Sequence, residues 1–281
     1  MIGAADCLFG IAYTIYFLAS IAYGANLFAK GTDWSLAAWA LAVAGWLAHT
    51  GALALLGLGK HHAPFTTFFE SVSFMSWSVV LAYLLVDRRG KAPALGAFAL
   101  PLAFLTIFVA STQPSYGADP LVTRDHSLKI HIAMSLLGYG SLALAFCAAV
   151  AYLVQERRLK RKRLGLLSRL ISLDEADNLA NSLAAVGFAL LTLGLITGFI
   201  FAYRDWRGLW ALDPKVVTSL AGWAVYAAYL YAHNVKGWRG RKTMFLLVVG
   251  FCVVVAGFVG VNVAGVGRHV YRPGAFGGDG L

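Results

Sequence analysis

The stretch Arg204-Asp-Trp-Arg-Gly-Leu-Trp-Ala-Leu-Asp-Pro-Lys215 lies between two long apolar runs, residues 182–203 and 216–232. Each run is long enough to cross the ~30 Å hydrocarbon layer of a membrane as a helix, so we expect the stretch between them to be a loop at a membrane surface. Its tryptophans, Trp206 and Trp210, suit a flat, aromatic, anionic ligand, because guanidinium groups beside them can meet carboxylates. Taken alone, the loop favours a simpler interpretation, an aromatic belt that anchors helix ends at the headgroups.

The composition of the whole chain indicates a membrane protein. Of the 281 residues, 59% are hydrophobic and only 13% are charged, which is too apolar for a soluble domain. The net charge of +10 comes from basic residues in short segments between apolar runs, as membrane topology requires, so we exclude nucleic acid as a partner. The three cysteines lie in apolar segments and form no C-x-x-C pair, so they predict neither a disulfide framework nor a thiol redox motif.

Apolar runs long enough to span a membrane recur along the chain. They are Ala5–Phe28, Trp34–Leu58, Phe68–Val86, Leu95–Ser111, Ile130–Val154, Ser182–Tyr203, Val216–Ala232 and Thr243–Val263. The sequence therefore predicts an all-α fold, a polytopic membrane bundle of about eight transmembrane helices. We expect one integral membrane domain over residues 1–281, because no linker or internal repeat divides the chain.

The basic residues predict how the bundle is oriented. They crowd between Arg157 and Arg169, after the fifth run, and loops rich in lysine and arginine belong in the cytoplasm. The basic loops 87–91 and 236–242 then fall on the same inner side, while both termini and the 204–215 loop fall outside. Residues 155–181 become a cytoplasmic basic and amphipathic segment, and the apolar spacing within Leu164–Leu183 predicts a short surface helix.

The histidines gather at the predicted outer side. His131 opens the fifth run and His269 follows the eighth, whereas His233 lies near the cytoplasm. A single histidine near an interface is more often a snorkelling polar group than a metal ligand. Two imidazoles flanking an aromatic, cationic loop, however, would supply both axial ligands of a haem iron. Zinc is disfavoured, because it would need a third or fourth ligand at close spacing.

Further motifs follow in order along the chain. They are His62-Ala-Pro-Phe-Thr-Thr-Phe-Phe-Glu-Ser71 with Ser76-Trp-Ser78, His126-Ser-Leu-Lys-Ile-His131, the run from Gly187 to Gly198 with Asp213-Pro-Lys215, and Gly260-Val-Asn262 with Gly267-Arg-His269-Val-Tyr271. Together they resemble the CcsA/ResC family of cytochrome c biogenesis proteins. The resemblance covers the family's H-x-P-x-x-N-x-Y-E-S segment, the histidines that open its fifth helix, the helix before its tryptophan-rich loop and its closing G-V-N and G-L-H-S-Y.

The resemblance implies haem handling on the external membrane face and presentation of haem for covalent attachment to apocytochrome c, as in system II cytochrome c biogenesis. By the same analogy His131 and His269 would be the axial ligands of the iron. Trp206, Trp210 and Asp213 would belong to the porphyrin platform. The implied cargo is haem b, and the implied partners are a CcsB/ResB-like membrane subunit and apocytochrome c, in a cytochrome c synthase of the bacterial cytoplasmic (inner) membrane.

The chain departs from the family pattern in the loop. Arg207 stands where a glycine is usual, Leu212 where a third tryptophan is usual, and Val216 where a glutamate is usual. The aromatic platform is therefore thinner. We expect Arg207 to add a contact with a haem propionate that offsets the lost tryptophan, although a basic residue at an interface can also point into the headgroups.

The seventh helix departs as well. The family's Y-L-H falls on Tyr229-Leu-Tyr231, so a tyrosine stands at the position of the family's histidine. The nearest histidine, His233, comes two residues later, and its side chain is rotated by ~200° about the helix axis from that position. His233 would hold haem only if the helix is rewound or haem sits differently. These departures resemble HemX-like and YpjD-like relatives, so the alternative function is a non-catalytic membrane protein with a structural or regulatory role in haem metabolism. A small-molecule transporter is a third possibility, but no inverted repeat or pair of broken helices supports it.

Overall fold

The computed structural model describes residues 2–28, 33–90, 92–112, 125–162, 171–205 and 212–267, and its regular elements are all helices. They are α1 (Ile2–Phe28), α2 (Ser35–Lys60), α3 (Phe68–Val86), α4 (Pro93–Ser111), α6 (His126–Lys160), α7 (Leu173–Asp205), α8 (Pro214–Asn234) and α9 (Arg241–Val255), which continues through the π-helix η3 (Ala256–Gly260) into α10 (Val261–Ala264). Seven of the helical stretches are long and apolar enough to cross a membrane, and α8 lies beside them. The predicted all-α membrane bundle of about eight helices is confirmed.

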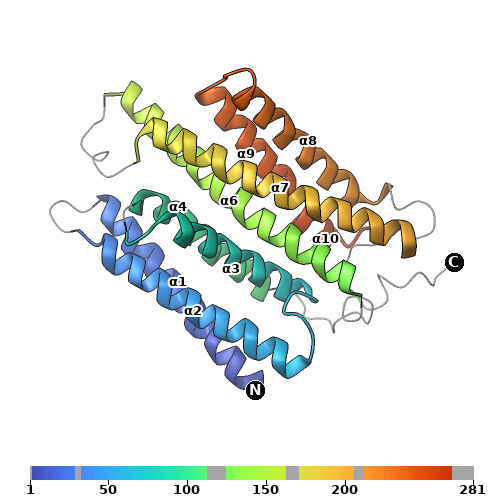
Figure 1. Cartoon of the computed structure of the whole chain (residues 1–281). Helices are drawn as coiled ribbons and strands as arrows, with labels where there is room; N and C mark the ends of the chain where they lie inside the picture. The colour runs from blue at the N-terminus through green and yellow to red at the C-terminus, as the bar shows by residue number, and fades with distance from the viewer. Residues whose placement is uncertain are drawn as a thin grey trace.

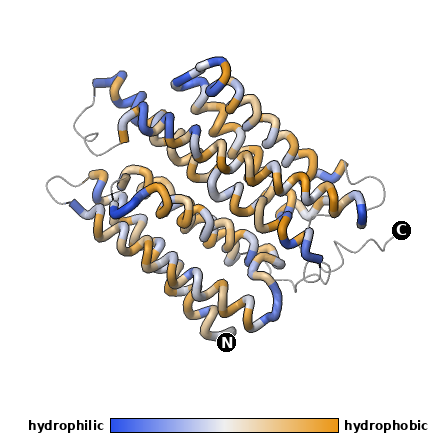
Figure 2. The backbone as a smooth tube through the Cα atoms, viewed as in Figure 1, coloured by the Kyte–Doolittle hydropathy of each residue, from blue (hydrophilic) through white to orange (hydrophobic). Residues whose placement is uncertain are grey.

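The helices lie roughly antiparallel in one bundle (Figure 1). α1 packs on α2 and α4, α3 packs on α4 and α6, and α6 packs along α7 and α9, with α8 against α9 and α7. Figure 2 shows apolar residues along the middle of the helices and polar residues gathered at their ends. This pattern fits a bundle whose flanks face hydrocarbon and whose ends face water.

Short polar side chains begin several helices. Thr67 caps α3, where its hydroxyl accepts from the Glu70 amide and Glu70 reaches back to the Thr67 amide, a capping box. Asp125 caps α6 through the Leu128 amide, and Asp213 caps α8 through the Lys215 amide. These caps fix the starts of α3, α6 and α8 at the sequence motifs quoted above.

Two boundaries differ from the expected ones. Of the predicted surface helix within Leu164–Leu183, the described part from Leu173 onward is the first part of the long helix α7. Likewise α6 extends to Lys160, well beyond the predicted end at Val154. A helix that leaves the membrane keeps its backbone hydrogen bonds without needing apolar side chains, so hydropathy does not mark these ends. Residues 163–170 lie outside the described part of the chain.

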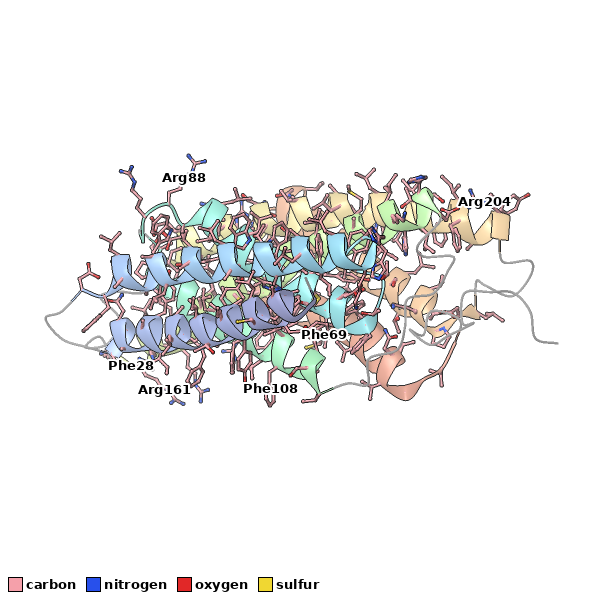
Figure 3. The ribbon with its side chains drawn as sticks, turned by 90° about the horizontal axis from the view of Figure 1, so that it is seen from below. Phe28, Phe69, Arg88, Phe108, Arg161 and Arg204 are labelled. Carbon is pink, nitrogen blue, oxygen red and sulfur yellow. The ribbon has the colours of Figure 1, made fainter. Side chains whose placement is uncertain are left out.

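The charged side chains distinguish the two ends of the bundle. Figure 3 shows Arg88 and Arg161 at one end and Arg204 at the other. We call the first the basic end and the second, where α6 begins, the His131 end. The inward-facing assignment of the basic end remains a prediction from the positive-inside rule.

Cysteine labelling tests this orientation. In a variant without Cys7, Cys147 and Cys252, we expect Leu212→Cys to react with a membrane-impermeant thiol reagent on intact cells, since Leu212 is 71% exposed at the His131 end. Lys160→Cys, at the basic end, should react only after permeabilisation. The reverse pattern would contradict the orientation and any role of the His131 end outside the membrane.

Candidate functional site

A pocket opens at the His131 end between α6, α7, α8 and η3. Its walls are mainly apolar, with a few polar groups, and it is lined by Leu128, His131, Ile132, Ser135, Leu136, Tyr139, Leu191, Leu195, Gly198, Phe199, Phe201, Ala202, Lys215, Val216, Ser219 and Phe258. An apolar cleft with a few convergent polar groups is the usual form of a ligand site. Of the predicted site residues, His131 is among these lining residues.

The imidazole of His131 is held in one orientation by the backbone of α7. Its Nδ1 lies 2.6 Å from the Gly194 carbonyl oxygen, which can only accept, so Nδ1 carries the hydrogen and donates it. Nε2 is then the nitrogen with the lone pair. Metal-binding histidines are commonly fixed in this way, with one ring nitrogen donating to a carbonyl and the other left as the ligand atom.

Glycines in α7 make room for the His131 ring. A Cβ atom at Gly198 would lie 2.6 Å from His131 Nδ1 and 2.7 Å from Cε1, and one at Gly194 would lie 2.5 Å from Ser135 Oγ. At either position a side chain would force the contacting group to shift. Small residues that let helix backbones approach closely are a common device of membrane bundles. The predicted motif from Gly187 to Gly198 therefore serves to seat α6, and His131 with it, against α7.

The opposite wall is formed where α9 changes into a π-helix. η3 presents Phe258, whose ring centroid lies 5.6 Å from that of Tyr139 and 6.2 Å from that of Phe68. The Lys215 ammonium lies 5.0 Å over the Phe258 ring, a cation–π contact. Single π-helical turns occur frequently at functional sites, because they re-aim one side chain.

The loop between α2 and α3 supports this wall through the buried carboxylate of Glu70. Glu70 accepts hydrogen bonds from Lys60 Nζ at 3.0 Å and from the Thr66 amide and hydroxyl at 2.9 Å. His62 Nδ1 is within 2.9 Å of the Thr66 hydroxyl oxygen. The motif from His62 to Ser71 thus has a structural role here: it ties down the chain just before Phe68, which contacts Phe258.

Two further contacts join the ends of neighbouring helices at the His131 end. Asp213 is 6% exposed, and a Cβ atom at Gly267 would lie 2.7 Å from its Oδ2, so the chain after α10 runs beside the start of α8. Arg204, at the end of α7, pairs with Asp125, which precedes α6. Burial opposes ionisation of Asp125, but hydrogen bonds from Ser127, Leu128 and Arg204 outweigh it and lower its pKa to about 2. The carboxylate therefore stays charged at neutral pH.

The other predicted residues fall elsewhere. Trp206, Arg207, Trp210 and His269 lie outside the described residues. His233 lies in the last turn of α8 at the basic end, 2% exposed, where its Nε2 is 2.9 Å from Asp177 Oδ2 and its Nδ1 is 3.1 Å from Asn234 Oδ1. About 18 residues of helix, or roughly 27 Å, separate it from Lys215. His233 and His131 therefore belong to different ends of the bundle.

The pocket size limits what it can hold. Its volume is about 80 Å³, whereas pockets that enclose a drug-sized ligand measure roughly 300–1,000 Å³. A porphyrin would enter it only in part, with His131 at the edge of the apolar surface. His49, by contrast, is a satisfied core residue: it is fully buried and its ring nitrogens contact Tyr16 and Ser73.

Sequence comparison relates the chain to cytochrome c assembly proteins. A family model described as "Cytochrome C assembly protein" matches residues 65–269. The "Cytochrome c biogenesis protein CcsA" of Prochlorococcus marinus (strain MIT 9313) is 32% identical over 253 residues, which cover 79% of this chain and 80% of the relative. The protein of the same name from Prochlorococcus marinus (strain NATL1A) is 30% identical over 293 residues that cover 93% of each chain.

A solved structure, "Cytochrome c Heme Lyase CcmF", shares the fold, with a TM-score of 0.69 at 17% sequence identity. The match covers 98% of this chain and 48% of that one, so this chain spans about half the length of that structure. At this identity the likeness shows the fold alone. The family match, however, extends from the loop before α3 to the segment after α10, and so includes every helix that builds the pocket. The protein therefore belongs to the cytochrome c assembly protein family.

Proposed function

We propose that the protein binds haem at the His131 end and presents it for covalent attachment to apocytochrome c. The observation that carries this proposal is the Nδ1 to Gly194 carbonyl hydrogen bond of His131 at the wall of an apolar pocket. It makes Nε2 the acceptor nitrogen, which is the form of imidazole that binds iron. Family membership supports the same conclusion.

The remaining parts of the haem site come from segments beside the pocket. His269 supplies the second axial ligand, and the chain from Gly267 to His269 can span at most about 7 Å from the position next to Asp213. Trp206 and Trp210 cover the porphyrin face, while Arg207 contacts a propionate. Asp213 contributes by capping α8, which holds Lys215 at the pocket wall.

Attachment adds a cysteine S–H across a haem vinyl C=C bond, so that sulfur bonds one carbon and hydrogen the other. The protein contributes by holding the haem and orienting it toward the cysteine. The cargo is haem b, and a CcsB/ResB-like membrane subunit completes the synthase. The whole chain, residues 1–281, acts as one domain of the bacterial cytoplasmic membrane. A haem site that included His233 would be a separate one, at the basic end.

The visible spectrum of the detergent-purified protein tests this function. We expect a low-spin, bis-histidine haem spectrum, with a pyridine haemochrome typical of haem b. Co-expression with a CcsB/ResB-like subunit and an apocytochrome should yield covalent cytochrome c. A protein that carries no haem, and takes up none when haemin is added, would instead support the HemX-like or YpjD-like alternative.

The second axial ligand has its own test. His269→Ala should leave a protein that still binds haem through His131 but with a five-coordinate or altered low-spin spectrum, since one axial position has lost its nitrogen. Added imidazole should restore the original spectrum in part. An unchanged spectrum and full haem occupancy in His269→Ala would show that the second ligand lies elsewhere.

A further inference from the structure

One face of α8 carries polar side chains through the middle of the bundle. Ser219, Tyr226, Tyr229 and His233 follow one another at intervals of seven, three and four residues, which place them on the same side of a helix. Tyr226 and Tyr229 are fully buried, and His233 is 2% exposed. The two tyrosines point to the interior of the bundle, so neither hydroxyl can reach the headgroup layer for its hydrogen bonds.

The two tyrosine hydroxyls find no protein partner. Within the described ranges, neither the Tyr226 nor the Tyr229 oxygen has a hydrogen-bond partner, although both are buried. A buried hydroxyl without a partner is costly, and the surrounding hydrocarbon offers no compensation. In proteins such groups are usually satisfied by ordered water where no protein atom reaches them. Two such hydroxyls one turn apart therefore indicate bound water rather than one isolated defect.

At the basic end the polar face meets a cluster that is open to solvent. Asp177 Oδ2 accepts from His233 Nε2 at 2.9 Å and from Arg239 Nη1 at 3.3 Å, and the Arg239 side chain is 56% exposed. Asp177 Oδ1 and, one turn further, Asn181 Oδ1 are buried acceptors without a partner among the residues that the structure describes. Both oxygens are hydrogen-bond acceptors, and water molecules can donate to them. Arg239 already balances the carboxylate charge, so a cation is not required.

At the other end the polar face reaches the pocket. Ser219 and Tyr139 both line the pocket, and their hydroxyl groups face each other closely enough to interact. Between Ser219 and Tyr226 this side of the helix bears Gly222, which is buried, and Trp223, whose indole N–H donates to Thr192 Oγ1 of α7. This interval measures about 10 Å along the helix axis. The Tyr226 side chain and a few water molecules, each about 2.8 Å from the next, are long enough to cross it.

We propose that the buried face of α8 carries a file of bound water molecules from the Asp177–His233–Arg239 cluster past Tyr229 and Tyr226 to the Tyr139–Ser219 pair on the pocket wall. Through it the pocket exchanges water and protons with the solution at the basic end. The ligand is water itself. The water file does not depend on haem binding, so the result of its test is independent of the proposed function.

Hydroxyl-radical footprinting of the full-length protein in detergent tests for the water directly. Radicals formed from bound water oxidise the side chains beside it, so Tyr226 and Tyr229 should be modified despite their burial. The matched controls are Tyr23 and Tyr83, which are equally buried but hydrogen-bond each other directly at 2.5 Å. We expect at least a several-fold faster modification of Tyr226 and Tyr229 than of Tyr23 and Tyr83. Equal, slow rates at all four would overturn the proposal.

Removing the hydroxyls gives a second, independent measurement. If Tyr226 and Tyr229 are dry, phenylalanine removes an unsatisfied group, and Tm should stay the same or rise. If they hold the water file, Tyr226→Phe and Tyr229→Phe should each lower Tm, by roughly 2–4 °C. The decrease in Tm of the double variant should then be smaller than the sum of the two single decreases, because both hydroxyls bind the same water molecules. Tyr231→Phe, on the exposed side of the same helix, is the control and should change nothing. An unchanged or raised Tm in both single variants would contradict the water file.

Discussion

Replacement of His131 by alanine is expected to weaken haem binding by more than about 100-fold, since loss of a mere supporting partner of a metal ligand already costs 10–100-fold in affinity. The iron would lose the nitrogen that α7 holds in position through the Gly194 carbonyl. The loss is measured by haemin titration of the purified variant and by the yield of covalent cytochrome c in cells. Added imidazole should restore part of both, because a small base can occupy the space that the ring leaves.

The matched control for this variant is His126→Ala. His126 opens the same helix but is exposed and does not line the pocket. It should leave haem affinity and cytochrome yield unchanged. If His131→Ala kept its haem with an unaltered spectrum, or if His126→Ala lost as much, the assignment of His131 as the ligand would be wrong.

The helices could be predicted from the sequence because the membrane imposes a simple rule. A spanning helix needs about 20 apolar residues, and the eight runs met this condition. Phe68–Val86 was predicted to the residue, because the capping sequence that starts at Thr67 coincides with the start of the apolar run. The extensions of α6 to Lys160 and of α7 back to Leu173 were not predicted. Those turns are polar, and hydropathy carries no information about helices outside the hydrocarbon layer.

The candidate site could be predicted only in part. His131 was found from its position at the start of a run, but its partner Gly194 lies 63 residues away and acts through a backbone carbonyl, which no side-chain pattern reveals. Gly187, Gly194 and Gly198 do fall on one helical face, and that spacing was a usable signal for close contact with another helix. Phe258 was missed, because its direction depends on the π-helical turn η3 and not on an α-helical register.

The same limit applies to His233. The sequence showed that it is displaced from the family position, but not that it would meet Asp177 of α7 and Arg239 of the following loop. Both partners are set by packing of α8 on α7, which is decided over the whole length of the helices. A single displaced residue is therefore better judged by its neighbours in space than by its distance from a family motif.

Gly198→Ala is expected to lower haem affinity by about 10–100-fold while leaving the fold intact, the range seen when the support of a metal ligand is disturbed. Its new Cβ would lie 2.6 Å from His131 Nδ1, so the ring must move away and its hydrogen bond to Gly194 must lengthen. A weaker hydrogen bond makes the imidazole a poorer donor to iron, which should raise the reduction potential of the bound haem. The control is Gly10→Ala in α1, where a Cβ meets no atom within 4 Å.

The double variant His131→Ala with Gly198→Ala shows whether the effect passes through His131. If Gly198 acts by seating the ring, its replacement should cost little further affinity once the ring is gone, so the two changes should be strongly non-additive. Imidazole should also rescue the double variant less well than His131→Ala alone, because the new methyl group occupies part of the vacated space. Full additivity, with equal rescue by imidazole, would mean that Gly198→Ala disturbs the bundle generally. It would contradict the proposal that Gly198 positions the His131 ring.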